Sequence, residues 1–357
     1  MSENHNSLLN SAKHPRAASY LPTVSTGWFD IPVLLTIFLT IELVFLLVEP
    51  SIISSPIYWI FIGISIPIAS WLILRKFFLI VILRTPLKER HNLIDERWEE
   101  IHFSGWGGDK MIGHHLIAEE GNPNLLLYIH GYGSSMASGE SRALHLVGQG
   151  MDIVTMDLRG HGNCNLRNNW TPLKVTADIE ALLDAVLERY DCPPSNFWIY
   201  GHSVGGYIGL RLASYPSSWW TDKVSGLMLE SPATSFPLII EDQIPTILRP
   251  TMPWIRQVLR KEYERIHPDL TVRYATAQIP HMGLPKDTPI LLLQASVDDR
   301  LGRKHYDLLM KYKDQIICEA YLLDRHTHTS RDDSSQRREH LEKWLKPRLS
   351  KHSERLL

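Results

Sequence analysis

A short segment, Gly201-His202-Ser203-Val204-Gly205-Gly206, places a serine hydroxyl where it could act as a nucleophile. The segment follows an apolar run that ends at Tyr200 and precedes a helix-like stretch from Val204 to Ser214. This context is typical of a sharp turn between a strand and a helix, in which side chains two residues from the serine would not fit. Glycine occupies both of those positions, so we expect Ser203 to form a covalent intermediate with its substrate.

A serine hydroxyl needs a histidine that takes its proton and a carboxylate that orients the histidine. After a strand–turn–helix nucleophile, the acid and then the histidine follow along the chain. Asp298 follows the apolar run Pro289–Gln294 after three intervening residues, where the acid is expected. Asp299 is the alternative, and Glu230, at the end of an earlier apolar run, is a third candidate.

Two histidines follow the last apolar run, which ends at Leu323. His328 lies about five residues beyond that run, a suitable reach for a loop that turns back over the serine. His326 remains the alternative base. The chain has 17 histidines, so a histidine is informative only when its place in the order fits.

The reaction also needs two backbone N–H groups that bind a developing oxyanion. One should come from Val204, directly after the nucleophile. The other should come from Tyr132, in the loop His130-Gly131-Tyr132-Gly133 that follows a buried apolar run. Gly131 and Gly133 allow the backbone of this loop to approach a substrate closely.

Apolar runs alternate with helix-like segments from about Asp95 onward, which predicts a mostly parallel sheet covered by helices on both faces. The hydrolase-like domain is predicted over residues 95–350. Residues 231–286, rich in proline and aromatic side chains, interrupt the alternation between two core strands and are predicted to form an inserted cap.

Two apolar runs, Ile31–Val48 and Ile57–Leu74, precede this domain, and each approaches the length of a membrane-crossing helix. We predict a two-helix transmembrane hairpin over residues 28–84, after a polar tail over residues 1–27. Lys and Arg occur in both outer flanks and not in the connecting turn, so both flanks should face the cytoplasm. The membrane bilayer is therefore an expected partner, and the hydrolase-like domain is expected on its cytoplasmic side.

The composition excludes several other classes of protein. Lys plus Arg (37) nearly balance Asp plus Glu (39). The sequence has no basic stripe interleaved with aromatic residues, so nothing in it indicates binding to nucleic acid. The three cysteines match neither a zinc-ligand pattern nor a disulfide framework. We expect serine chemistry with no metal and no cofactor.

The segments HGYGSS, DLRGHG, GHSVGG, ASVDD and HTH, in this order between Trp98 and Lys346, resemble the α/β-hydrolase superfamily. The similarity is strongest to its branch of monoacylglycerol lipases, lysophospholipases and serine aminopeptidase-like esterases. This resemblance implies hydrolysis of an ester, thioester or amide through an acyl-enzyme. The oxyanion loop lacks the HGGPG segment of proline iminopeptidases, which makes peptidase activity less expected.

The leading hypothesis is a membrane-anchored serine esterase or lipase that acts on an acyl lipid or another lipophilic ester. One alternative is a thioesterase or acyltransferase of a biosynthetic pathway, because water and alcohol acceptors use the same triad. Another is a non-catalytic binding protein with a hydrolase fold.

Overall fold

The computed structural model describes residues 39, 41, 56–82, 92–119, 122–166, 170–214, 220–244, 246–266, 277–330 and 334–353. The chain divides into two compact units. The first comprises Met1–Leu21, Thr85–Arg249 and Asp269–Leu357, and the second comprises Pro22–Arg84 and Pro250–Pro268.

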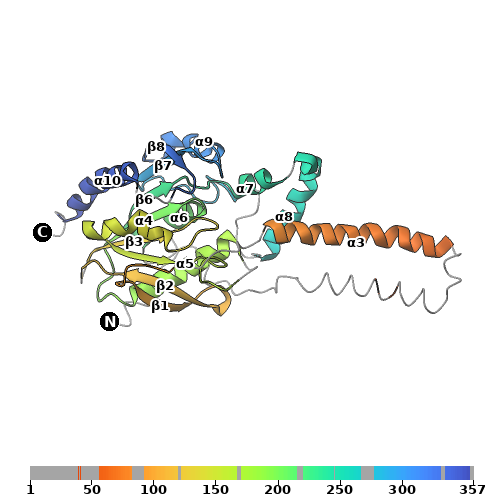
Figure 1. Ribbon diagram of the computed structural model, residues 1–357, viewed down its shortest axis with the longest axis horizontal. Helices are drawn as coiled ribbons and strands as arrows, with labels where there is room; N and C mark the ends of the chain where they lie inside the picture. Colours follow the sequence, from red (N-terminus) through yellow and green to blue (C-terminus); the bar gives the residue numbers. More distant parts are fainter. Residues whose placement is uncertain are drawn as a thin grey trace. The chain divides into compact units, whose positions relative to one another are not determined.

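The first unit contains an eight-stranded sheet with the strand order β1-β2-β4-β3-β5-β6-β7-β8 (Figure 1). The pairs β1–β2 and β2–β4 are antiparallel, and every other neighbouring pair is parallel. The strands are β1 (Glu99–Ser104), β2 (Lys110–Leu116), β3 (Asn124–Ile129), β4 (Asp152–Met156), β5 (Asn196–His202), β6 (Val224–Glu230), β7 (Ile290–Val297) and β8 (Cys318–Thr327).

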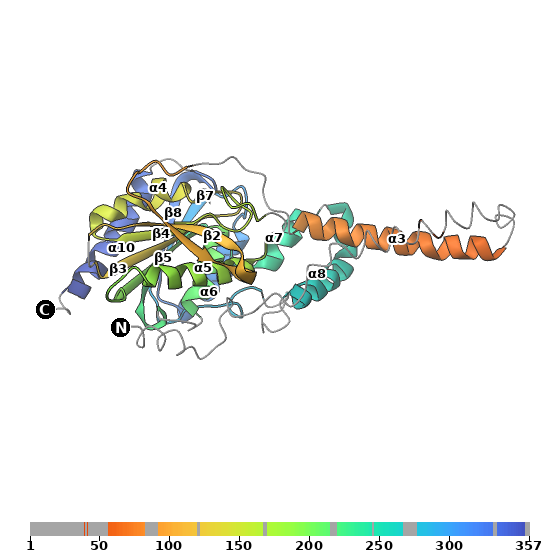
Figure 2. The same cartoon turned by 90° about the horizontal axis from the view of Figure 1, so that it is seen from below.

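Helices cover both faces of this sheet, with α5 and α6 below it and α4 above it in Figure 2. The α-helices of the unit are α4 (Ser138–Ala143), α5 (Pro172–Leu187), α6 (Val204–Ser214), α7 (Phe236–Gln243), α9 (Lys304–Met310) and α10 (Ser335–Ser353). Its 3₁₀ turns are η3 (Trp106–Gly108), η4 (Leu144–Gln149), η5 (Thr221–Lys223) and η8 (Lys313–Gln315), and η6 (Thr246–Thr251) continues into the second unit. The mostly parallel sheet with helices on both faces confirms the α/β part of the predicted fold class.

The central strands are buried on both faces, as their unbroken apolar sequences predict. The five residues Leu125–Ile129 of β3 are each 1% exposed or less. On the face covered by α4 and α10, Trp198 of β5 meets Trp344 of α10 edge to face at 6.0 Å. This packing fixes α10, and therefore the loop that leads into it, against the sheet.

The strand order reverses direction at β3, which lies between β4 and β5. The chain leaves β3 toward β4 and then crosses to the other side of β3 to form β5. In open α/β sheets, ligands bind outside the carboxyl ends of the strands at such a reversal. The segments after β3 and β5 are the predicted oxyanion loop and the predicted nucleophile turn.

The second unit contains the helices α3 (Pro56–Ile82) and α8 (Met252–Ile266), and α8 belongs to the insertion between β6 and β7. The first predicted membrane span lies outside the described residues except for Leu39 and Ile41, which are helical. The second predicted span falls within α3. In the part of the chain that the structure describes, no helix has both the length and the apolar character that crossing a membrane requires.

Candidate active site

Ser203 lies in the turn between β5 and α6 and has a positive φ of 54°. Main-chain hydrogen bonds hold it there. Its N–H donates to the carbonyl of Glu230 (3.0 Å), and its own carbonyl accepts from the N–H groups of Ala233 (2.8 Å) and Gly206 (3.0 Å). A non-glycine residue in this conformation is strained, and such strain is typical of a nucleophile turn.

The glycines around Ser203 are required by close main-chain contacts. A Cβ on Gly201 would overlap the main chain of Gly205, and a Cβ on Gly205 would overlap the carbonyl oxygen of Ile129. The turn therefore packs directly against the end of β3. This is the physical reason for the glycine spacing on which the nucleophile prediction rests.

The predicted oxyanion loop touches the nucleophile turn. A Cβ on Gly131 would lie 2.9 Å from the Cβ of Ser203, so the loop main chain passes next to the serine. Tyr132 follows Gly131 in this loop, and Val204 is the first residue of α6. The N–H of Val204 therefore lies at the positive end of a helix dipole, a favourable position for a developing negative charge.

His130 braces the oxyanion loop. Its Nε2 accepts a hydrogen bond from the N–H of Leu158 (3.0 Å), which leaves the ring proton on Nδ1. Nδ1 then donates to the carbonyl of Gly131 (2.8 Å). A neutral histidine thus ties the loop after β3 to the loop after β4.

His328 and Asp298 form a buried pair at the carboxyl ends of β8 and β7. His328 Nδ1 lies 3.0 Å from Asp298 Oδ2, and both side chains are about 95% buried. The carboxylate can only accept, so the ring proton sits on Nδ1 and Nε2 keeps its lone pair.

Asp298 is held as an anion. Burial raises the pKa of Asp298. The hydrogen bond from His328, the charge of that ring and the N–H groups of Leu301 and Arg300 lower it by more, so the pKa falls to about 2. Leu301 and Arg300 donate to Oδ1 at 2.9 and 3.1 Å, and Gln294 donates to Oδ2 at 3.0 Å. A fully ionised carboxylate is what orients and stabilises a protonated imidazole.

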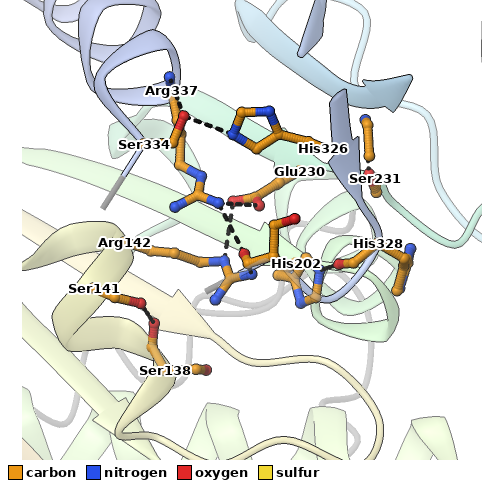
Figure 3. Close-up of polar contacts among 12 residues, drawn as sticks. Ser138, Ser141, Arg142, His202, Glu230, Ser231, His326, His328, Ser334 and Arg337 are labelled. Carbon is orange, nitrogen blue, oxygen red and sulfur yellow. Dashed lines mark hydrogen bonds and ion pairs between the residues drawn. The ribbon is translucent and has the colours of Figure 1, made fainter. Parts of the chain in front are cut away.

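The two adjacent alternatives do not form this buried pair. Asp299 is exposed. His326 Nε2 bonds Ser334 Oγ at 2.6 Å, and its Nδ1 bonds the carbonyl of Asp324 at 2.9 Å. Figure 3 shows His326 turned toward the start of α10, away from His202. The geometry therefore favours Asp298 and His328 within each pair.

The third acid candidate, Glu230, also lies apart from the imidazole of His328. Its carboxylate binds Arg142 and Arg337 in a buried cluster (Figure 3). Those partners occupy the carboxylate oxygens, so Glu230 is not available to orient His328.

His202 is a residue of the site that the sequence reasoning did not single out. Its Nε2 lies 2.9 Å from the carbonyl oxygen of His328, and the two rings are 5.0 Å apart. Because a carbonyl only accepts, His202 donates from Nε2. Burial, followed by the charge of Arg142, lowers its pKa well below the usual value, so the ring stays neutral. His202 thereby brings the His328 loop against the nucleophile turn.

Aromatic side chains border the oxyanion loop. Tyr132 meets His161 and Trp170 edge to face, at 5.3 and 5.7 Å between ring centroids. Trp170 lies 6.3 Å from Phe236, which begins α7 only three residues after Ala233. Tyr132 is 43% exposed, whereas Trp170 and Phe236 are buried. Among the described residues, no group of three or more His, Cys, Asp or Glu side chains is arranged to hold a metal ion.

Residues 122–328, more than half of the chain, match the family model Hydrolase_4, described as serine aminopeptidase S33. The chain belongs to this family. Membership confirms the resemblance to the serine aminopeptidase-like branch of the α/β hydrolases, and the matched range includes both Ser203 and His328.

Curated relatives match shorter stretches. The chain is 29% identical over 171 residues to the multifunctional-autoprocessing repeats-in-toxin of Vibrio vulnificus, which covers 47% of this chain and 3% of the toxin. It is 29% identical over 97 residues to the protein bem46 of Schizosaccharomyces pombe, which covers 27% of this chain and 29% of that protein. The chain thus spans only a small part of these relatives.

Solved structures share the fold. A crystal structure of an alpha-beta hydrolase from Vibrio vulnificus has a TM-score of 0.51 at 22% identity and covers 72% of this chain and 81% of its own. An esterase from Pyrococcus furiosus has a TM-score of 0.54 at 14% identity and covers 74% of this chain and 98% of its own. At these identities the likeness extends to the fold alone.

The two adjacent pairs generate a matched prediction. His328→Gln and Asp298→Asn should each lower kcat on an activated ester by about 10⁴-fold, because each removes a part of the relay to the serine. His326→Gln and Asp299→Asn should stay within about twofold of the unchanged protein, as exposed or loop-bracing residues usually do. Steady-state kinetics of the four variants measures this. A large loss from His326→Gln with none from His328→Gln would reverse the choice of base.

Proposed function

We propose that the chain is a serine hydrolase that cleaves a carboxylic ester through an acyl-enzyme. The observation that carries this proposal is the buried His328–Asp298 pair together with a serine held at positive φ between a strand and a helix. His202, directly before that serine, bonds the carbonyl of His328. Each of the three groups has the chemistry that acyl transfer needs, and family membership agrees with that chemistry.

The proposed reaction has two halves. Ser203 Oγ attacks the acyl carbonyl while His328 Nε2 takes its proton, and Asp298 stabilises the resulting imidazolium. His328 then protonates the alcohol that leaves, and the acyl group stays on Ser203. In the second half, His328 takes a proton from water, the hydroxide attacks the acyl carbonyl, and Ser203 recovers its proton as the acid departs. The N–H groups of Tyr132 and Val204 bind the oxyanion in both halves.

A probe of the nucleophile tests this proposal. The unchanged protein should react covalently with a fluorophosphonate, and the labelled peptide should contain Ser203, because only an activated serine attacks such a probe quickly. Ser203→Ala should abolish the labelling. Ser141→Ala, which removes a serine that bonds only the carbonyl of Ser138, is the control and should label normally. Undiminished labelling of Ser203→Ala would contradict the proposal.

We further propose that the substrate is an acyl lipid or another lipophilic ester. The aromatic side chains of Tyr132, Trp170 and Phe236 lie along the oxyanion loop and the start of the insertion, next to the residues that bond Ser203. Apolar rings at this place favour an apolar acyl or alcohol group over a charged one.

Replacing one of these three aromatic side chains by a smaller one should slow the cleavage of esters with long acyl chains most. Trp170→Leu should reduce the ratio of kcat/KM for an octanoyl ester to that for an acetyl ester by about tenfold, which corresponds to about 1.4 kcal/mol of lost apolar contact. Trp220→Leu removes an equally buried tryptophan that packs on Phe197 instead, and it should leave the ratio unchanged. Equal ratios in both variants, or faster cleavage of an aminoacyl amide than of any ester, would contradict the assigned substrate class.

We propose as well that residues 28–84 attach the enzyme to a membrane, with the hydrolase domain on the cytoplasmic side. The support is the sequence of this segment and the apolar surface of α3. Its side chains at Tyr58, Ile62, Ser65, Ala69 and Leu72 are at least partly covered. Among the side chains of α3 whose burial the structure describes, seven large apolar ones are exposed, namely Trp59, Ile60, Ile64, Ile66, Ile68, Trp71 and Ile73. An apolar surface of this extent is unusual in contact with water.

Fractionation tests the attachment. The full chain should remain in the membrane pellet after alkaline washing, and protease added to the cytoplasmic face of sealed vesicles should digest the hydrolase domain. The double change Ile60→Lys and Ile64→Lys should release the chain by adding charge to the apolar surface of α3. Ile94→Lys, at an exposed position after that segment, is the control. Recovery of the unchanged chain in the soluble fraction would contradict attachment, and protection from protease would contradict the orientation.

A further inference from the structure

A buried charged cluster lies behind the nucleophile turn. It consists of Glu230, at the carboxyl end of β6, together with Arg142 of α4, Arg337 of α10 and Tyr200 of β5. Glu230 touches the nucleophile through its main chain, because its carbonyl accepts the N–H of Ser203 at 3.0 Å. Its side chain extends into the protein, where it and both arginine side chains are at least 94% buried.

The carboxylate of Glu230 organises the cluster. Arg142 Nε donates to it at 3.1 Å, Tyr200 Oη donates at 2.6 Å, and Arg337 reaches it with a terminal nitrogen at 3.2 Å (Figure 3). Burial raises the pKa of Glu230, but the charges of Arg142 and Arg337 lower it to about 2. The carboxylate is therefore ionised and sets the direction of both guanidinium groups.

Both guanidinium groups converge on one main-chain atom. Arg142 and Arg337 each donate from a terminal nitrogen to the carbonyl oxygen of Ser330, at 3.0 Å in each case. Ser330 lies two residues beyond His328, in the loop between β8 and α10. The carbonyl of His328 itself accepts from His202. Buried side chains from β5, α4 and α10 thus hold the carbonyls of His328 and Ser330.

Stability alone is a weak explanation for this arrangement. Two cations and one carboxylate removed from water carry a desolvation cost that their attraction seldom exceeds, and apolar side chains of similar volume often serve a core equally well. Apolar side chains cannot donate hydrogen bonds, so they cannot hold a particular main-chain carbonyl in place. The two arginines do this at the carbonyl of Ser330.

We propose that Glu230, Arg142 and Arg337 are positioning residues that place the His328 loop, so that His328 meets both Asp298 and Ser203. They act through Ser330 and touch no reacting atom. The inference rests on the proposed function, since it gives these residues a part in the reaction of Ser203. It predicts that the cluster contributes mainly to the rate of the chemical step and little to substrate binding or folding.

An apolar replacement of the whole cluster separates these contributions. The variant with Arg142→Met, Tyr200→Phe, Glu230→Leu and Arg337→Met removes every charge together and leaves no unpaired buried ion. It should keep the melting temperature of the unchanged protein and a KM within about twofold, while kcat falls by at least about tenfold. The control is Glu99→Leu with Arg189→Met, an exposed pair in which the arginine also bonds a main-chain carbonyl, and it should keep full kcat.

If the apolar variant does not fold, a conservative variant and its proton NMR spectrum test the same inference. Arg337→Lys keeps the charge but replaces the planar fork that reaches Glu230 and Ser330, so it should lower kcat at unchanged KM. The far-downfield proton resonance of the His328–Asp298 hydrogen bond should weaken or shift in the same variant. It should be unchanged in the control pair.

The outcomes distinguish this inference from the proposed function. Unchanged kcat and an unchanged resonance in a folded cluster variant would overturn the positioning role while leaving the serine hydrolase intact. Absence of fluorophosphonate labelling in the unchanged protein would instead overturn the proposed function. The resonance, which needs no turnover, would still report whether the cluster positions His328.

Discussion

The positive φ of Ser203 is the constraint on which the rest of the site depends. Holding a non-glycine residue in this conformation costs about 1–3 kcal/mol, so the surroundings must fix it from several sides. They do so through main-chain hydrogen bonds of Ser203 and through glycine contacts that bring the ends of β3 and β5 together. The same close packing places the oxyanion loop beside the serine and the start of α6 beneath it. A looser turn would separate all three features.

The base approaches this rigid turn from the far end of the sheet, on a loop that needs its own supports. Asp298 fixes the ring of His328, His202 holds its carbonyl, and two arginines hold the carbonyl of Ser330. Each support has a defined protonation state: Asp298 is ionised, and His202 is neutral because it is buried near a guanidinium. The loop therefore keeps its geometry while the charge on His328 changes during the proposed reaction.

The α/β architecture of the sheet could be predicted from the sequence because it follows from local patterns, whereas no membrane-crossing helix is found among the described residues. Apolar runs mark buried strands, and the glycine spacing marks a turn that sterics alone require. The choice between His326 and His328 was harder, since it depends on where the end of β8 turns each side chain. The roles of Arg142 and Arg337 could not be predicted, because arginines on short or polar helices usually face water. Only the packing of α4 on β3 and of α10 on β7 and β8 buries them beside Glu230.

In the proposed reaction Ser203 carries the acyl group during turnover. Mass spectrometry of the full chain, stopped by acid while it hydrolyses an octanoyl ester, tests this directly. A fraction of the protein should be heavier by one octanoyl group, with the added mass on the peptide that contains Ser203. This fraction should accumulate further in His328→Gln if that variant is first acylated with a highly activated ester. Acyl mass on another residue, or turnover without any covalent species in either protein, would contradict the account.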